Sequence, residues 1–224
     1  MYHLCRPLPG ALLSVVLLVL SGCAKTPPTR FYVLPALTGA ETAALSSVVK
    51  PDLTIGVGPV TLPPYLDRPQ IVTRSSQAKL ELGEFDQWAA PLQDTFARVL
   101  AENLSLLLGT DRVLLQPWPR TAEVDYQVTV EVLRFDGGVG GEVVLAVRWS
   151  LIGADGKEQL MRKSHYQAPT NTRDYEATIT AMSRILADLS RDIAATLQTT
   201  VQQASTRRQL PASAPGTTRS RLRQ

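Results

Sequence analysis

Few side chains of this sequence are of the types that perform catalysis. Two histidines are present, and because one lies in an apolar leader, only His165 remains, in the segment KSHYQ. Its neighbour Ser164 does not form a dyad with it, because adjacent residues of a strand point to opposite faces. Glu81, Glu84 and Asp86 are candidates for glycoside hydrolysis, which takes two facing carboxyl groups. Glu81 and Glu84 are an odd number of positions apart, so in a strand they point to opposite faces and do not form such a pair. We therefore expect that the protein is not an enzyme.

Cofactor and metal sites also lack their usual sequence patterns. The glycine clusters GVGP (56–59) and GGVGG (137–141) resemble phosphate loops, but neither opens a helix, whose N-terminus would hold the anion. We interpret them as turn or bulge glycines. No H-E-x-x-H, G-x-S-x-G or C-x-x-C motif occurs. Neither a metal nor a non-covalent cofactor is therefore expected.

Cys23 is the residue with the most specific chemical prediction. An apolar run of ten residues, ALLSVVLLVL (11–20), follows Arg6 and leads into LSGC (20–23). Ten residues of helix span about 15 Å, half of the hydrocarbon core of a bilayer, so the run is typical of a signal peptide and not of a membrane span. LSGC resembles the bacterial lipobox, whose cysteine thiol receives a diacylglyceryl group before cleavage. We therefore predict that residues 1–22 are removed and that Cys23 carries a covalent lipid.

Lipidation at Cys23 has consequences for location and for the other cysteine. Cys5 leaves with the signal peptide, so no disulfide is expected. Two or three acyl chains on one cysteine anchor a protein firmly, whereas a single chain binds a membrane only marginally. The residue after a lipoprotein cysteine influences sorting, and Ala24 favours the outer membrane, with the body in the periplasm. The alternative is an ordinary signal peptide followed by a chance cysteine.

The positive charge of the chain is concentrated at its C-terminal end. The formal net charge is +3, yet residues 201–224 contain five arginines and no acidic residue. Without these arginines and Arg6, 17 basic residues stand against 20 acidic ones. A nucleic-acid-binding protein more often carries a basic patch on its folded body, so nucleic acid is not an expected partner. The tail is rich in Gln, Ser, Thr and Pro without a period, and we expect it to be disordered.

The body of the chain has the periods of an α+β domain. Eight segments alternate apolar and polar residues or are rich in β-formers, and they are bounded by prolines and polar turns. The expected strands are residues 31–34, 53–60, 70–74, 79–85, 112–118, 124–135, 142–152 and 158–167. A hairpin is expected around residues 75–77, and the last three strands predict an antiparallel meander. We expect a mixed, mainly antiparallel sheet with two long amphipathic helices packed on it.

Two segments have the period of an amphipathic helix. From about Asp86 to Gly109 apolar residues recur at helical spacing, with Pro91 tolerated only in the first turn. A second helix is expected after Asn171 or Thr172, either of which could cap it. Its apolar stripe would pack on its own sheet, as we expect, or make a helix contact with another molecule. The expected organisation is a signal peptide (1–22), a tether (23–30), a domain (31–200) and a disordered basic tail (201–224).

Several of these segments, taken in order, resemble one family. Similarity to the PqiC family of ABC-type transport auxiliary lipoproteins is carried by the lipobox, FYVL (31–34), IGVGPVTLPPYLDRPQIVTR (55–74), WAAPLQDTFARVLAENLSLLLG (88–109) and YQVTVEVLRFDG (126–137). The resemblance covers about residues 20–200. Its most specific parts are YLDRPQIV (65–72) and the W-A-x-P-L segment (88–92). It implies that residues 31–200 form a periplasmic transport-auxiliary domain.

The resemblance also implies a function and a partner. The protein would be a non-catalytic docking subunit that works with an MCE-domain, membrane-spanning protein to move lipid between the two membranes and to support envelope integrity. The loop LPPYLDRP (62–69) is the candidate contact, because its prolines reduce the conformational entropy lost on docking. Tyrosine and arginine are frequent at interface hot spots. The candidate partner-binding residues are Tyr65, Leu66, Asp67 and Arg68.

Other interpretations stay open at this point. Tyr65 could pack on its own sheet while Asp67 and Arg68 form a solvated pair, the prolines then fixing only a strand connection. A lipid-anchored periplasmic hydrolase would need a site at His165 or Glu81. A lipoprotein that binds lipid or envelope polymer directly would need no such site. Self-association of the chain into a homo-oligomer is a further alternative.

Overall fold

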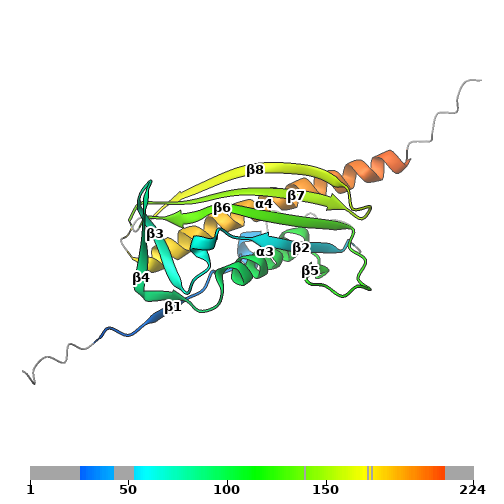
Figure 1. Cartoon of the computed structure of the whole chain (residues 1–224). Coiled ribbons are helices and arrows are strands. Elements are labelled where there is room, and N and C mark those ends of the chain that lie inside the picture. The colour runs from blue at the N-terminus through cyan, green and yellow to red at the C-terminus, as the bar shows by residue number, and fades with distance from the viewer. Residues whose placement is uncertain (1–25, 43–52, 139, 171, 173, 210–224) are drawn as a thin grey trace, which may run out of the picture.

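The computed structural model has the expected α+β fold, in which two sheets and two long helices form the body (Figure 1). It describes residues 26–42, 53–138, 140–170, 172 and 174–209. The signal peptide, Cys23 and residues 210–224 lie outside the described residues, so those predictions stay predictions. No helix within the described ranges is both long and apolar enough to cross a membrane.

The larger sheet has five strands in the order β5–β2–β6–β7–β8. Their bounds are Val113–Leu115 (β5), Ile55–Thr61 (β2), Tyr126–Gly137 (β6), Glu142–Gly153 (β7) and Glu158–Pro169 (β8). Strands β6, β7 and β8 form the expected antiparallel meander, whereas β2 is parallel to both β5 and β6. The register of β2 on β6 shifts between Val57 and Val60, where Gly58 has a φ of 128°. The interpretation of GVGP as bulge glycines is thus confirmed.

The smaller sheet has three strands in the order β1–β4–β3. Strands β3 (Gln70–Ser76) and β4 (Lys79–Trp88) form the expected hairpin, and β1 (Arg30–Tyr32) is parallel to β4 at the edge. A single 3₁₀ turn, η1 (Pro64–Leu66), connects β2 to β3 and thereby joins the two sheets. The described chain begins at one end of the body beside β1, and α4 ends at the opposite end (Figure 1).

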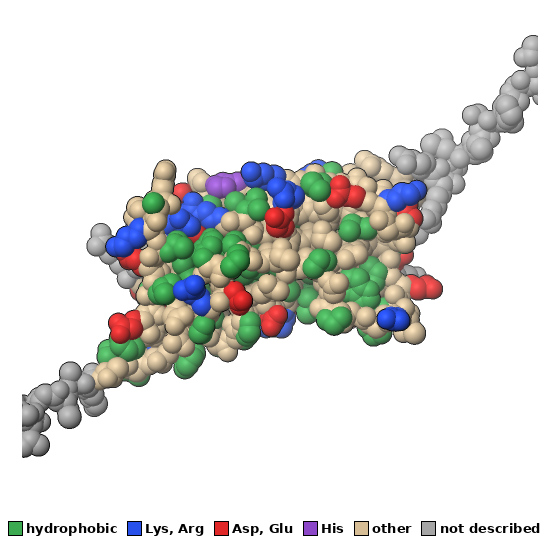
Figure 2. All heavy atoms as spheres, in the orientation of Figure 1, with side chains coloured by type: hydrophobic (Ala, Val, Ile, Leu, Met, Phe, Trp, Pro, Cys, Tyr) green, Lys and Arg blue, Asp and Glu red, His purple; other side chains and the backbone are tan. Residues whose placement is uncertain are grey.

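Helices α3 (Leu92–Leu108) and α4 (Tyr175–Gln209) cover one face of the larger sheet, and a four-residue helix, α2 (Gly39–Thr42), precedes them. Helix α3 packs on β2 and β5, and α4 packs on β6, β7 and β8. The apolar stripe of α4 is buried within this domain, as expected, with Ile185, Leu186 and Leu189 fully covered. In the part of the chain that the structure describes, no α-helix covers the opposite face of the sheet, which shows hydrophobic and charged side chains intermixed (Figure 2).

A polar contact links three segments within the core. The Asn103 side chain of α3 accepts a hydrogen bond from the Leu37 backbone N–H at 2.7 Å and donates one to Ser190 Oγ of α4 at 3.1 Å. Elsewhere in the core, the rings of Phe96 and Phe135 meet edge to face with centroids 5.4 Å apart. The buried amide has its bonding groups engaged, so it orients the N-terminal segment and both helices without an unpaired polar group.

Three expected boundaries were wrong. Helix α3 begins at Leu92 and not near Asp86, because Trp88 pairs with Tyr32 in the small sheet and Pro91 stands at the N-cap. Its end is as expected, since Gly109 adopts the left-handed conformation after the last turn.

The second and third differences concern α4. Its first turn is capped by Asp174 and not by Thr172, because the Asp174 Oδ1 accepts a hydrogen bond from the Ala177 N–H at 2.6 Å; Asn171 lies outside the described residues. The helix also continues to Gln209, nine residues beyond the expected domain end at Thr200. Val201 is buried there, so the apolar stripe of α4 continues into the segment whose polar composition predicted a disordered tail.

Candidate functional site

The loop between β2 and β3 is a compact turn whose backbone is bonded to itself. Pro63 is extended, with φ −60° and ψ 143°, and its carbonyl accepts a hydrogen bond from the Leu66 N–H at 2.9 Å. The Pro64 carbonyl accepts from Asp67 at 3.2 Å, and the Leu66 carbonyl accepts from Arg68 at 2.9 Å. Proline φ restriction and these bonds together make the loop rigid.

Tyr65 points from this loop to the larger sheet. Its hydroxyl donates a hydrogen bond to Asp136 Oδ2 at 2.7 Å, and its ring is half-buried. Burial and the hydrogen bond to Asp136 raise the pKa of Tyr65 to about 12. The hydroxyl therefore serves an internal contact, which matches the interpretation in which Tyr65 packs on its own sheet.

Asp136 is a fully buried carboxylate shared by three donors. The guanidinium of Arg74 on β3 binds both of its oxygens at 2.8 Å, and Arg134 Nε binds Oδ1 at 2.9 Å. Burial alone would raise the pKa of Asp136, but the hydrogen bonds from Arg74, Tyr65 and Arg134 outweigh it and lower that pKa. Because Phe135 faces α3, Asp136 faces the other side of the sheet, where the loop and β3 cover it.

The four predicted contact residues therefore divide into two pairs. Tyr65 and Leu66 face inward, with Leu66 only 3% exposed. Asp67 and Arg68 are exposed, and across the described ranges neither side chain has a hydrogen bond or an ion pair. Only the second pair is free to bind a partner without breaking an internal contact.

A cavity of about 370 Å³ lies beside this exposed pair. One wall is formed by Leu62 and residues 66–69 of the loop. The other wall is formed by Trp88 and residues 90–93, in the segment that leads into α3. The Trp88 N–H donates a hydrogen bond to the Pro69 carbonyl at 2.7 Å and so holds the walls together. We call this cavity the loop groove. The two most specific segments of the family resemblance, residues 65–72 and 88–92, meet in it.

The candidates for catalysis are not assembled into a site. Ser164 Oγ accepts a hydrogen bond from Trp149 Nε1 at 3.1 Å, and His165, opposite Ala146 in the register, lies on the other face of β8. In the part of the chain that the structure describes, no group of three or more His, Cys, Asp or Glu residues is arranged to hold a metal ion.

The three carboxylates on β4 also do not form an acid–base pair. Glu81 is exposed and pairs with Lys79 at 3.2 Å. Asp86 is buried and bound by residues of β1: Arg30 Nη2 donates to Oδ2 and Tyr32 Oη to Oδ1, each at 2.8 Å. Asp86 thus holds the edge strand to the sheet.

Sequence reasoning missed the roles of Asp86 and Asp136. The expected strand ends at residue 135, whereas β6 continues to Gly137 and includes Asp136. One signal was available: the apolar positions of β6 change phase between Val132 and Phe135, which marks the bulge seen in the register between Val132 and Arg134. The partners of Asp136 on β3 and in the loop carry no comparable signal in the sequence.

Comparison with known proteins decides the family. The model of the ABC-type transport auxiliary lipoprotein component matches residues 32–194, which is most of the chain. The chain belongs to this family. It is 24% identical over 185 residues to the intermembrane transport lipoprotein PqiC of Escherichia coli (strain K12), covering 82% of this chain and 94% of that protein. The PqiC of Shigella flexneri matches with the same identity and coverage.

A solved structure also shares the fold. A crystal structure of a Xanthomonas campestris protein aligns with a TM-score of 0.63 at 17% identity, covering 79% of this chain and 99% of the other. At this identity the likeness concerns the fold alone. The family and its named members make this chain an auxiliary lipoprotein of a transport system, and the members named PqiC are intermembrane transport lipoproteins.

Proposed function

We propose that this protein is a non-catalytic docking subunit of an MCE-type intermembrane lipid transport system, anchored in the outer membrane through Cys23 with its body in the periplasm. Family membership supports the transport role, and the LSGC motif supports the anchor. The observation that carries the docking role is the loop groove. In it the two segments that identify the family line one apolar cavity next to two unengaged charges.

The groove has the properties of a docking site for an apolar side chain. Its walls include Leu66, Trp88 and Leu92, all at most 5% exposed, so their positions are set by the core. A preformed wall loses little conformational entropy when a partner binds. The exposed charges of Asp67 and Arg68 at the rim select a partner segment with complementary charges.

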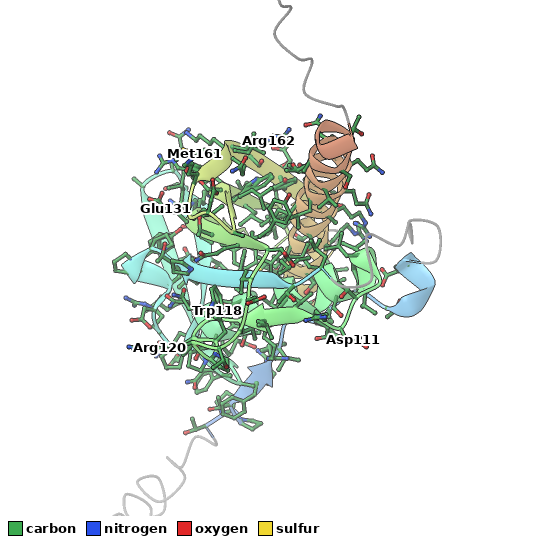
Figure 3. All side chains as sticks on the ribbon, turned by 90° about the vertical axis from the view of Figure 1, so that its right-hand side faces the viewer. Asp111, Trp118, Arg120, Glu131, Met161 and Arg162 are labelled. Carbon is green, nitrogen blue, oxygen red and sulfur yellow. The ribbon has the colours of Figure 1, made fainter. Side chains whose placement is uncertain are left out.

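Site-specific photocrosslinking tests this contact. A photoreactive amino acid at Ala90, which is exposed and lines the groove, should crosslink in cells to an MCE-domain protein. The same group at Arg120, an exposed residue of the loop before β6 (Figure 3), is the matched control. Equal crosslinking from both positions, or none from Ala90, would contradict the proposal.

Substitution of the rim gives a second test. Arg68→Ala should weaken recovery of the partner in a pull-down from envelope extracts, whereas Arg120→Ala should leave it unchanged. A change at Tyr65 disturbs Asp136 as well as the groove, so Arg68 is the cleaner position. If both alanine variants recover the partner equally, Arg68 takes no part in docking.

The anchor is tested separately. Cys23→Ser should release the protein from membranes, and the unchanged protein should follow outer-membrane markers in a density gradient. Lipid that copurifies stoichiometrically with the released Cys23→Ser protein would favour direct lipid binding over docking.

A further inference from the structure

The edge strand β1 lies at the end of the body where the described chain begins (Figure 1). It is paired on one side only, through Arg30, Phe31 and Tyr32 opposite residues 86–88 of β4. The Ala89 N–H adds a hydrogen bond to the Tyr32 carbonyl at 2.9 Å. Its backbone is thus held to the sheet along its whole length.

The side chains of this segment alternate between two environments. Arg30 and Tyr32 face Asp86 and bind it at 2.8 Å, and Leu34 is 3% exposed in the core. Successive residues of an extended chain point to opposite sides, so Phe31 and Val33 face away from the body. The contacts to Asp86 fix this orientation, because turning Phe31 inward would break them.

Phe31 and Val33 are the most exposed large apolar side chains in the described ranges. Phe31 is 65% and Val33 57% exposed, ahead of Met161 at 54%. Figure 2 shows hydrophobic side chains at this end of the body. The contacts of Arg30 and Tyr32 with the buried Asp86 hold Phe31 outward, so its ring takes no part in the core and is available for a contact outside the chain.

Their distance from the anchor identifies that contact. Phe31 is the eighth residue after Cys23, so a fully extended chain places it at most about 28 Å from the lipidated sulfur. Tethering makes a further contact with the membrane intramolecular, so two side chains are enough where they would not bind from solution. Phenylalanine and other large apolar side chains on membrane-bound surface segments bury at the boundary between headgroups and acyl chains.

We propose that Phe31 and Val33 insert into the interface of the membrane that holds the Cys23 lipid, and that β1 thereby sets the orientation of the body on that membrane. The inference rests on the lipid anchor of the proposed function, but it does not depend on the loop groove or on an MCE-domain partner. With β1 against the bilayer, the end of α4 points away from it, because the two lie at opposite ends of the body.

Depth-dependent quenching tests the insertion on the mature protein that carries the Cys23 lipid. Cysteines that replace Phe31, Val33 or Met161 one at a time are labelled with an environment-sensitive fluorophore, and the protein is reconstituted into phospholipid vesicles. Met161 is the matched control, being similarly exposed on β8, which lies on the opposite side of the molecule from β1 in both ribbon views (Figure 3). Lipids brominated in their acyl chains should quench the probes at 31 and 33 by about twofold or more and leave the probe at 161 unchanged.

The outcomes separate the contact from the anchor. Flotation of each sample with the vesicles reports the anchor, so failure to float would contradict the lipid on Cys23 and not the geometry of β1. Protein that floats but shows equal quenching at 31, 33 and 161 overturns the insertion. Probes at 31 and 33 that are shielded from water but insensitive to brominated lipid would assign the surface to a second protein, which also overturns it. Unchanged thermal unfolding of the labelled proteins verifies that the fold is intact.

Discussion

Two buried carboxylates, Asp86 and Asp136, are bound by the same types of donor in different parts of the molecule. Each is bound by a tyrosine hydroxyl and an arginine guanidinium. Asp136 has two arginines, of which Arg74 is 19% exposed, whereas the side chain of Arg30, the partner of Asp86, is 62% exposed. Ion pairs with an exposed partner are weakened by solvent, and those with buried partners are much less so.

The two sites differ in how firmly they hold their segments: Asp136 fixes the loop and β3 to the body, whereas Asp86 holds β1 more weakly. Asp136 on β6 binds Tyr65 of the loop and Arg74 of β3, which lie 71 and 62 residues before it in the chain, and so locks the loop groove to the body. Asp86 holds only the three-residue strand β1. The proposed docking surface is therefore preformed, while β1, next to the predicted anchor, can separate from the sheet at lower cost.

The largest expected effect comes from removing the carboxylate of Asp136. Asp136→Asn should lower the free energy of unfolding by about 3 kcal/mol, because the positive charges of Arg74 and Arg134 then lose their buried counter-charge. Urea unfolding measures this. The control is Asp67→Asn, an exposed aspartate without an internal partner, which should stay within about 0.5 kcal/mol of the wild type. If the two variants were equally stable, Asp136 would not contribute to the stability of the fold.

Asp86→Asn should cost less, about 2 kcal/mol, close to the loss of one hydrogen bond to a charged acceptor from Tyr32. The solvent-exposed Arg30 side chain can leave the site, so it is not trapped without a partner. Limited proteolysis should then cut near β1 before the rest of the domain. A loss of stability as large as that of Asp136→Asn would show that the two sites are equivalent after all.

Tyr65→Phe should cost about 1.5 kcal/mol, because only one of the donors to Asp136 is lost. The two changes act on one network, so their effects should not add. In the Asp136→Asn background the same substitution should cost less than about 0.5 kcal/mol. A double-mutant cycle by urea unfolding measures the coupling, and full additivity would contradict the shared network.

The smallest effect is expected from acid. The pKa of Asp136 is lowered in the folded state, so its contribution to stability is present above the ordinary aspartate pKa and is lost as pH falls through the folded value. The difference in unfolding free energy between the wild type and Asp136→Asn should therefore stay constant near neutral pH and shrink below about pH 4. A difference that grew as pH fell would mean that the folded pKa is raised.

Local patterns in the sequence were sufficient for the elements themselves. Alternation predicted the β6–β7–β8 meander, and helical spacing predicted α3 and α4, because one buried face imposes its period on a strand or helix wherever it packs. Glycine and proline marked the end of α3 and the bulge in β2, since these residues act through their own backbone conformation. The lipobox is likewise a linear signal.

Contacts between distant segments could not be predicted in this way. No local pattern shows that the Tyr65 hydroxyl meets Asp136, that Trp88 pairs with Tyr32 and not with its neighbours in a helix, or that α4 extends to Gln209. Such contacts depend on strand order and register, which are set by the packing of the whole domain. The sequence alone therefore determined that residues 62–69 form a stiff loop, and only the tertiary structure decided which two of its four candidate residues are turned inward and which two are exposed.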